Sequence, residues 1–212
     1  MFNYNEKTIF NKQFKINELF KLMKADKEIK QDAQCITAIA LSNVLSPNTT
    51  NLEPSENVKE IYIIKIEINA KEIPNKFIEA FNRQILFQTL FKVYYNTDVK
   101  YICSLKEFGK DSNMKILKTY STDWQKELQQ DLPITTKLDT MYKAIIENIT
   151  GFVFRQDESF NDYMERTSSI KRQKLEIERL TKLMNSEKQP NIRMNMNDKI
   201  KQMQNDLQKM EE

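Results

Sequence analysis

The sequence predicts an α+β fold, in which a mixed β-sheet core packs with two or three helices and is followed by a C-terminal helical hairpin or coiled coil. Short β-branched runs in the first two thirds of the chain predict the sheet. Apolar residues at three- and four-residue spacing in the last third predict the hairpin. The chain has 212 residues, of which 40% are apolar, so it can form one core of moderate size and an extension.

Residues 1–30 are expected to form an N-terminal helical segment. Asn17 can cap a helix, and apolar residues then follow at helical spacing, with lysines on the polar side up to residue 30. This pattern predicts a short amphipathic helix over residues 17–30.

The core domain is expected over residues 31–155, and its first strand at 35–41 leads into a loop of turn-forming residues. Residues 60–68 form the clearest strand, because one face is apolar and half of the other face is apolar too. This strand is therefore expected at the centre of the sheet. Pro74 suits the first turn of the next helix. The apolar stripe of that helix is Phe77, Ile78, Phe81 and Ile85.

The second half of the core domain is expected to contain a β-hairpin. Residues 89–95 and 99–105 are strand-like on either side of turn-forming residues. A further short strand is expected at 114–119. An apolar stripe over 138–149 predicts a helix, and Gly151 is placed where a left-handed cap would end it.

Residues 156–212 are predicted to form two helices broken at Pro190, either as an antiparallel hairpin or as an oligomeric coiled coil. Methionine is frequent here, and its adaptable side chain suits a surface that contacts a partner protein. An ordinary hairpin seam is the alternative interpretation. The residues predicted to bind a partner are Ile170, Ile177, Leu180, Met184, Met196, Ile200, Met203, Leu207 and Met210.

The composition excludes several kinds of enzyme. Without histidine, the chain cannot build a Ser-His-Asp triad or a histidine zinc site. Gly109 and Gly151 are isolated, so no glycine-rich phosphate loop exists, and Cys35 and Cys103 are interpreted as reduced core residues. We therefore expect no cofactor and no metal. No apolar run approaches 18 residues and no secretory leader is visible, so we expect a cytoplasmic protein without a membrane span.

Carboxylate and lysine chemistry is the remaining catalytic alternative. A metal-dependent nuclease would place acidic residues and a Glu-x-Lys pair on adjacent strands. The candidates are Glu60, Glu67, Asp98 and Lys100, but the order is unusual because Lys65 precedes Glu67. Ordinary charge pairing across strands explains the same residues.

Two further groups of residues suggest recognition rather than catalysis. The string Tyr120-Ser121-Thr122-Asp123-Trp124 contains the only tryptophan of the chain. One interpretation is a recognition corner with Tyr120, Asp123 and Trp124 as its motif residues. The other is a capped turn whose indole fills the core. A stacking platform for nucleic acid would use the aromatic residues Phe91, Tyr94, Tyr95 and Tyr101, for which sheet packing is the alternative.

Three strings together resemble the family called domain of unknown function 4391, found in bacteria and archaea. They are residues 60–68 leading into Pro74, the Tyr120 to Trp124 string, and residues 187–191 running into 195–200. The resemblance implies a strand-rich core followed by a coiled-coil tail. It carries no established activity and no catalytic residues. Residues 82–87 depart from the pattern, because they lack the expected proline-containing turn.

The resemblance also implies a setting, because genes of this family often lie near helicase and DNA-methyltransferase genes in restriction-like or antiphage loci. We therefore expect a non-enzymatic accessory or adaptor protein of a bacterial DNA-handling system that docks through its C-terminal coiled coil. The expected partner is a helicase- or methyltransferase-type defence protein. Nucleic-acid binding and homo-oligomer formation stay open, and the nuclease is the alternative.

Overall fold

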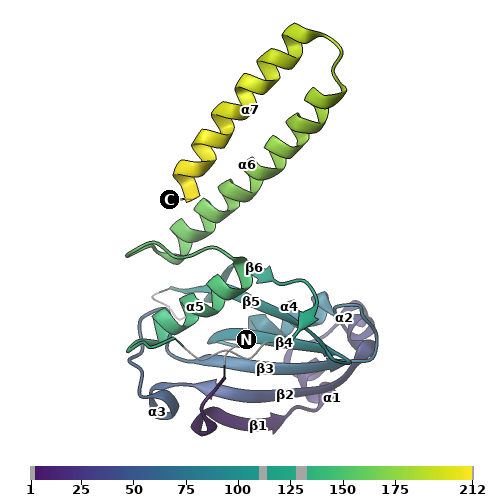
Figure 1. Cartoon of the computed structure of the whole chain (residues 1–212). Helices are drawn as coiled ribbons and strands as arrows, with labels where there is room; N and C mark the ends of the chain where they lie inside the picture. The colour runs from purple at the N-terminus through teal and green to yellow at the C-terminus, as the bar shows by residue number, and fades with distance from the viewer. Residues whose placement is uncertain (1–2, 110–113, 128–132, 212) are drawn as a thin grey trace. The chain divides into compact units, whose positions relative to one another are not determined.

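The computed structural model describes residues 3–109, 114–127 and 133–211 (Figure 1). The chain forms two compact units, Met1–Val153 and Phe154–Glu212. The first unit combines a mixed sheet with helices and the second is a pair of helices, so the predicted α+β class with a C-terminal helical pair is confirmed.

The described residues of the first unit form a seven-stranded sheet in the order β1-β2-β3-β4-β5-β6, with β7 paired to β5. β3 and β4 are parallel, and every other pairing in this order is antiparallel. The strand at 60–68 is central, as predicted. The strands are β1 (Ile9–Gln13), β2 (Ile36–Leu45), β3 (Ile61–Ile68), β4 (Gln88–Tyr95), β5 (Asp98–Phe108), β6 (Met114–Ser121) and β7 (Gln125–Lys126).

The N-terminal region differs from the sequence prediction. Residues 9–13 form β1, which pairs with β2 at the sheet edge, and the single helix predicted over 17–30 is wrong. Lys24 has a left-handed backbone with φ of 49°, which ends the first helix. Asp26 then caps a second helix by accepting a hydrogen bond from the Ile29 backbone N–H at 2.8 Å. These helices are α1 (Ile16–Leu22) and α2 (Lys27–Asp32).

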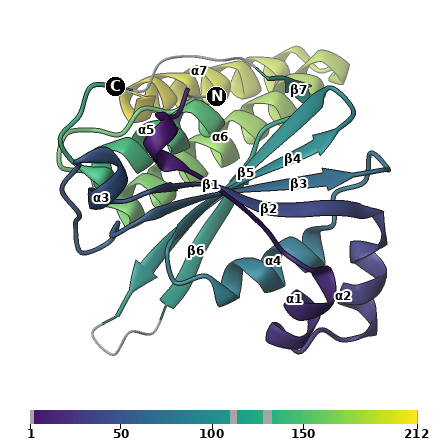
Figure 2. The same cartoon turned by 90° about the horizontal axis from the view of Figure 1, so that it is seen from below.

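The remaining helices of the first unit cover both faces of the sheet (Figure 2). α4 lies with α1 and α2 on one face, and all four residues of its predicted apolar stripe are buried. α5 packs against β5 and β6 on the opposite face. The expected loop after β2 contains a short helix, α3. The bounds are α3 (Pro47–Thr50), α4 (Asn75–Gln84) and α5 (Leu138–Thr150), with two short 3₁₀ turns, η1 (Glu6–Thr8) and η2 (Ala33–Cys35).

Gly151 ends α5 as predicted, with a left-handed φ of 74° and its N–H donating to the Glu147 carbonyl at 2.8 Å. Apart from its own neighbours in the chain, none of the described residues has an atom within 4 Å of the position that a Cβ would occupy. We therefore expect Gly151→Ala to lower the free energy of unfolding by about 1 kcal/mol through backbone strain alone. Chemical denaturation would measure this, and Gly151→Asn, which tolerates the left-handed region better, should cost less.

The second unit is the helical pair α6 (Phe160–Ser186) and α7 (Pro190–Glu211), which run antiparallel after a break before Pro190, as predicted (Figure 1). The two helices contact each other along their lengths, and the Gln173 side chain donates to the Met203 carbonyl at 2.6 Å. At the base of α6, the Phe154 ring stacks on Tyr163 with centroids 3.7 Å apart. Among the described residues, no helix is long and apolar enough to cross a membrane.

Candidate functional site

The sequence string from Tyr120 to Trp124 forms a corner at the end of the β4–β5 hairpin. Thr122 exchanges hydrogen bonds with Tyr101: its backbone N–H donates to the Tyr101 carbonyl at 3.0 Å, and its hydroxyl accepts from the Tyr101 N–H at 3.1 Å. Two residues of β7 then pair with the start of β5. Residues 122–127 therefore run around the end of the hairpin and place side chains on both faces of the sheet.

On the face that carries α4, Trp124 packs edge-on against Tyr95 with ring centroids 6.3 Å apart. The indole is partly exposed, so it borders the core rather than filling it. Lys71 lies 5.8 Å from the Trp124 ring and also pairs with Asp98 at 3.4 Å. Lys126 pairs with the same carboxylate at 2.6 Å. Hydrogen bonding to Lys126 is the main cause of the lowered pKa of Asp98.

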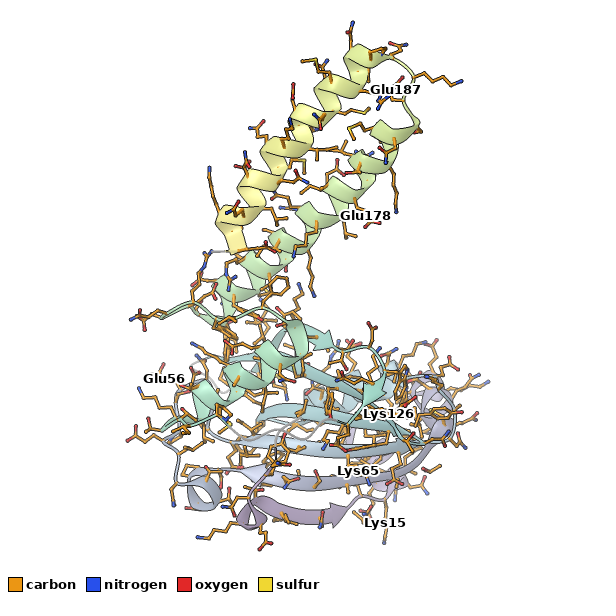
Figure 3. All side chains as sticks on the ribbon, in the orientation of Figure 1. Lys15, Glu56, Lys65, Lys126, Glu178 and Glu187 are labelled. Atoms are coloured by element: carbon orange, nitrogen blue, oxygen red, sulfur yellow. The ribbon has the colours of Figure 1, made fainter. Side chains whose placement is uncertain are left out.

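On the opposite face, the Glu127 carboxylate is held by two side chains of β4. The Lys92 ammonium pairs with Oε1, and the Tyr94 hydroxyl donates to Oε2 at 2.7 Å. Lys65 of β3 lies 5.1 Å from the Tyr94 ring centroid and pairs with Glu67 at 2.7 Å. Figure 3 labels Lys65 on the sheet and Lys126 on β7. We call Lys65, Lys92, Tyr94 and Glu127, with Tyr4 and Tyr101 described next, the Glu127 cluster.

Two buried tyrosine hydroxyls complete the Glu127 cluster. Tyr101 is 1% exposed, and the hydroxyls of Tyr4 and Tyr101 are both buried without a hydrogen-bond partner in the described part of the chain. Burial is the largest cause of their raised pKa values, and the charge of the Glu127 carboxylate raises both further. The hydroxyls therefore lie within electrostatic reach of Glu127.

The structure separates the residues considered for a nuclease. Glu60 precedes β3, whereas Glu67 lies near the other end of that strand. The register aligns Glu67 with Tyr94 and Val99, and Ile68 with Tyr95 and Asp98, so Glu67 and Asp98 point to opposite faces. Lys100, on β5, is aligned with Val93. Across residues 3–109, 114–127 and 133–211, no three acidic or cysteine residues lie close enough to share a metal ion.

The residues predicted to bind a partner lie along the contact between α6 and α7. Ile170, Leu180 and Ile200 are buried there, and the other six are half-buried. Other apolar residues of the pair point to solvent, and the three- and four-residue spacing did not reveal them because they lie off the seam. Their exposed fractions are Leu175 66%, Leu183 42%, Ile192 37% and Met194 67%.

Lys106 was also missed in the sequence, because one lysine in a strand pattern is ordinarily exposed. Its side chain is fully buried, and its ammonium donates to three carbonyls, those of Asn82 (3.2 Å), Ile85 (2.8 Å) and Phe87 (2.7 Å). It also contacts the Thr89 hydroxyl at 3.2 Å. Lys106 thus holds the turn between α4 and β4, the segment where this chain lacks a proline. Burial lowers the pKa of Lys106 to about 7.

A surface pocket of about 480 Å³ lies beside α2 and the start of α4, and Cys35 is among its lining residues. Burial is the main cause of the raised pKa of the Cys35 thiol, which disfavours the reactive thiolate. Asp32 accepts a hydrogen bond from the Phe77 N–H at 2.9 Å, and Lys76 pairs with Glu28 at 2.7 Å. These contacts connect α2 to the start of α4 beside the pocket. Cys103, the other cysteine, is also free and is fully buried.

The three sequence segments that suggested a family are distributed over the two units. A match between the whole chain and a family model therefore tests all three. The model described as domain of unknown function (DUF4391) matches residues 2–207. The chain belongs to this family. The DUF4391 match spans the first unit and nearly the whole helical pair of the second unit. The family resemblance is therefore confirmed over almost the entire chain. No curated protein and no solved structure matches the chain.

Proposed function

We propose that this DUF4391 protein is a non-enzymatic accessory subunit that docks onto a larger protein of a bacterial DNA-handling system through the α6–α7 pair. The observation that carries the proposal is that this pair is a compact unit of its own and exposes apolar side chains away from its own seam. Exposed apolar side chains on a helical surface favour protein contact.

The outer surface of α6 is suited to present these side chains in a fixed arrangement. Leu175 and Leu183 are exposed on α6, and ion pairs along the same helix join Arg179 to Glu176 and Lys182 to Glu178, both at 2.7 Å. Such exposed pairs support a helix only modestly. The seam residues are occupied by contact between α6 and α7, so the proposed dock lies on the outer residues instead.

The DNA-handling part of the proposal rests on the family. Genes of this family often lie near helicase and DNA-methyltransferase genes, and this favours a helicase- or methyltransferase-type protein as the partner. The separation of the candidate carboxylates described above gives no support to the alternative metal-dependent nuclease. Mg²⁺- or Mn²⁺-dependent cleavage that is lost in Glu67→Ala would nevertheless establish that alternative.

A pull-down from the native cell tests the dock with the full chain. We expect the double variant Leu175→Glu, Leu183→Glu to recover about tenfold less partner protein, because charged groups replace two exposed apolar contacts. Leu86→Glu is the matched control, since Leu86 is 58% exposed but belongs to the first unit. Circular dichroism should show the same helix content in all three proteins.

Two results would contradict the dock. One is that the unmodified chain recovers no protein. The other is that the double variant and the Leu86→Glu control recover the same partner in the same amount.

A further inference from the structure

The Glu127 carboxylate occupies an anion-binding position built by the sheet. Lys92, whose side chain is 14% exposed, supplies a cation to one oxygen, and Tyr94 supplies a hydroxyl donor to the other. Burial raises the pKa of Glu127, but the hydrogen bonds from Lys92 and Tyr94 outweigh burial, so the pKa lies below its ordinary value. The two donors on β4 therefore favour a negatively charged group at this point.

More hydrogen-bond donors lie around the Glu127 carboxylate than donate to it. The buried hydroxyls of Tyr4 and Tyr101 lie within electrostatic reach of the same carboxylate, but neither forms a hydrogen bond of good geometry with the described residues. A buried hydroxyl without a partner is unfavourable, so the site is incompletely satisfied when Glu127 fills it. Lys65, which pairs with Glu67, places a second cation above Tyr94.

The Glu127 side chain can leave this position without unfolding its surroundings. Its side chain is 32% exposed, and the preceding residues are attached by contacts of their own. Thr122 is bonded to Tyr101, and Lys126 is paired with Asp98 at 2.6 Å. A rotation of the Glu127 side chain would therefore open the site while β7 stays paired to β5.

We propose that Lys92, Tyr94, Tyr101 and Tyr4 form a binding site for a phosphate group, and that Glu127 fills this site as an internal competitor when no phosphate is bound. A phosphate has more acceptor oxygens than a carboxylate, in a tetrahedral arrangement, and can accept from all four donors. With Glu127 displaced, Lys65 and Lys92 outnumber Glu67, so the opened site carries a net positive charge. The proposal concerns the first unit alone and does not depend on the dock on α6.

Titration with inorganic phosphate tests the site in the full chain. Trp124, the only tryptophan, lies three residues from Glu127 and reports binding by its fluorescence, with calorimetry as a second readout and sodium chloride holding the ionic strength constant. We expect Glu127→Ala to bind phosphate about tenfold more tightly than the unmodified chain, because the competitor is removed. Glu79→Ala is the control, since it removes an exposed carboxylate that pairs with Arg83 elsewhere in the unit.

Two more variants, made in the Glu127→Ala background, separate this site from a general change in charge. Lys92→Met should abolish phosphate binding. Tyr101→Phe should weaken binding several-fold while the melting temperature changes little, because the hydroxyl is buried without a hydrogen-bond partner among the described residues. If Glu127→Ala does not fold, Glu127→Gln removes the charge with less change in shape and is expected to tighten binding in the same direction.

A single-stranded thymidine oligonucleotide distinguishes the sources of phosphate. Tighter binding of the oligonucleotide than of inorganic phosphate, lost in Lys92→Met, would identify the nucleic-acid backbone as the ligand. Binding of inorganic phosphate alone would identify a free phosphate. Equal affinity of the unmodified chain, Glu127→Ala and the Lys92→Met double variant, or no binding by any of them, would overturn the proposal.

Discussion

Lys106→Met is expected to lower the free energy of unfolding of the sheet unit by about 3 kcal/mol. The substitution retains much of the apolar volume but leaves the carbonyls of Asn82, Ile85 and Phe87 without the ammonium that they bind. A buried acceptor that loses its partner costs about 1–3 kcal/mol. The Asn82 carbonyl lies near the end of α4, and those of Ile85 and Phe87 lie in the turn before β4. The substitution should therefore destabilise the segment that connects the parallel strands β3 and β4.

The stability contributed by Lys106 also depends on pH. Its pKa is about 7 in the folded protein, against an ordinary value of 10.5 that applies to the unfolded chain. Between these values the unfolded chain binds more protons, so the free energy of unfolding should rise as the pH increases from about 7 towards 10.5. The Lys106→Met protein should lack this rise.

Denaturation followed by Trp124 fluorescence measures both effects, because the tryptophan belongs to the sheet unit. Lys100→Met is the matched control on the same strand, and we expect it to change stability by less than about 0.5 kcal/mol, because Lys100 is half-exposed. If Lys106→Met is as stable as the unmodified chain at pH 7, the ammonium does not support this turn.

Arg166→Met is expected to destabilise the base of the α6–α7 pair by about 3 kcal/mol. Arg166 binds Glu158 through two nitrogens, at 2.6 and 2.8 Å, and the two side chains are only 10% and 7% exposed. Removing one partner of a buried ion pair leaves the other charge in a poorly solvated position. Arg166 also lies 5.6 Å from the Tyr163 ring, so its removal weakens packing as well.

The same ion pair predicts an acid-sensitive helical pair. Burial raises the pKa of Glu158, but the hydrogen bonds and positive charges of Arg166 and Arg155 together outweigh burial, so the pKa is lowered below its ordinary value of 4.5. A lowered pKa gives stability that is present above the ordinary value and is lost as the pH falls through the folded-state pKa. Arg166→Met should weaken this dependence, although the contacts of Glu158 with Arg155 are retained.

Thermal melts followed by circular dichroism, between pH 7 and pH 3, measure the acid dependence through helix content. Arg179→Met is the control, because Arg179 forms an exposed pair with Glu176 on the same helix and should contribute little to stability. An Arg166→Met protein that melts like this control would show that the buried pair does not stabilise the helical pair.

Prediction from sequence succeeded where a periodic pattern coincided with burial. The strand at 60–68 is nearly continuous in apolar residues and is largely buried, and the apolar stripe of α4 repeats at helical spacing and is buried, both as expected. Prediction failed at the N-terminus because burial there is slight. All five residues of β1 are exposed, so the segment lacks the alternation of apolar and polar residues that indicates a half-buried strand. The end of the first helix depends on the left-handed backbone of one residue, Lys24.

The candidate site could not be assembled from the sequence. Lys92, Tyr94 and Glu127 are brought together because β7 turns the chain around the end of the β4–β5 hairpin. Tyr4, from the N-terminal part of the chain, lies within electrostatic reach of Glu127. Trp124 was expected either at a recognition corner or in a capped turn whose indole fills the core. It lies just before β7 and is partly exposed, and its role in recognition stays a prediction. Glu127, three residues later, had no pattern that distinguished it from other surface acids.

The sequence alone determined the fold class, the central strand, the β4–β5 hairpin and the break before Pro190, because hydrophobic periodicity and turn chemistry are local properties of the chain. It also determined the family. The tertiary structure alone decided which charges are buried and what they face: Lys106 beneath the α4 turn, Arg166 against Glu158, and Glu127 among lysine and tyrosine side chains. Burial and electrostatic pairing depend on residues distant in the sequence, and no local pattern contains that information.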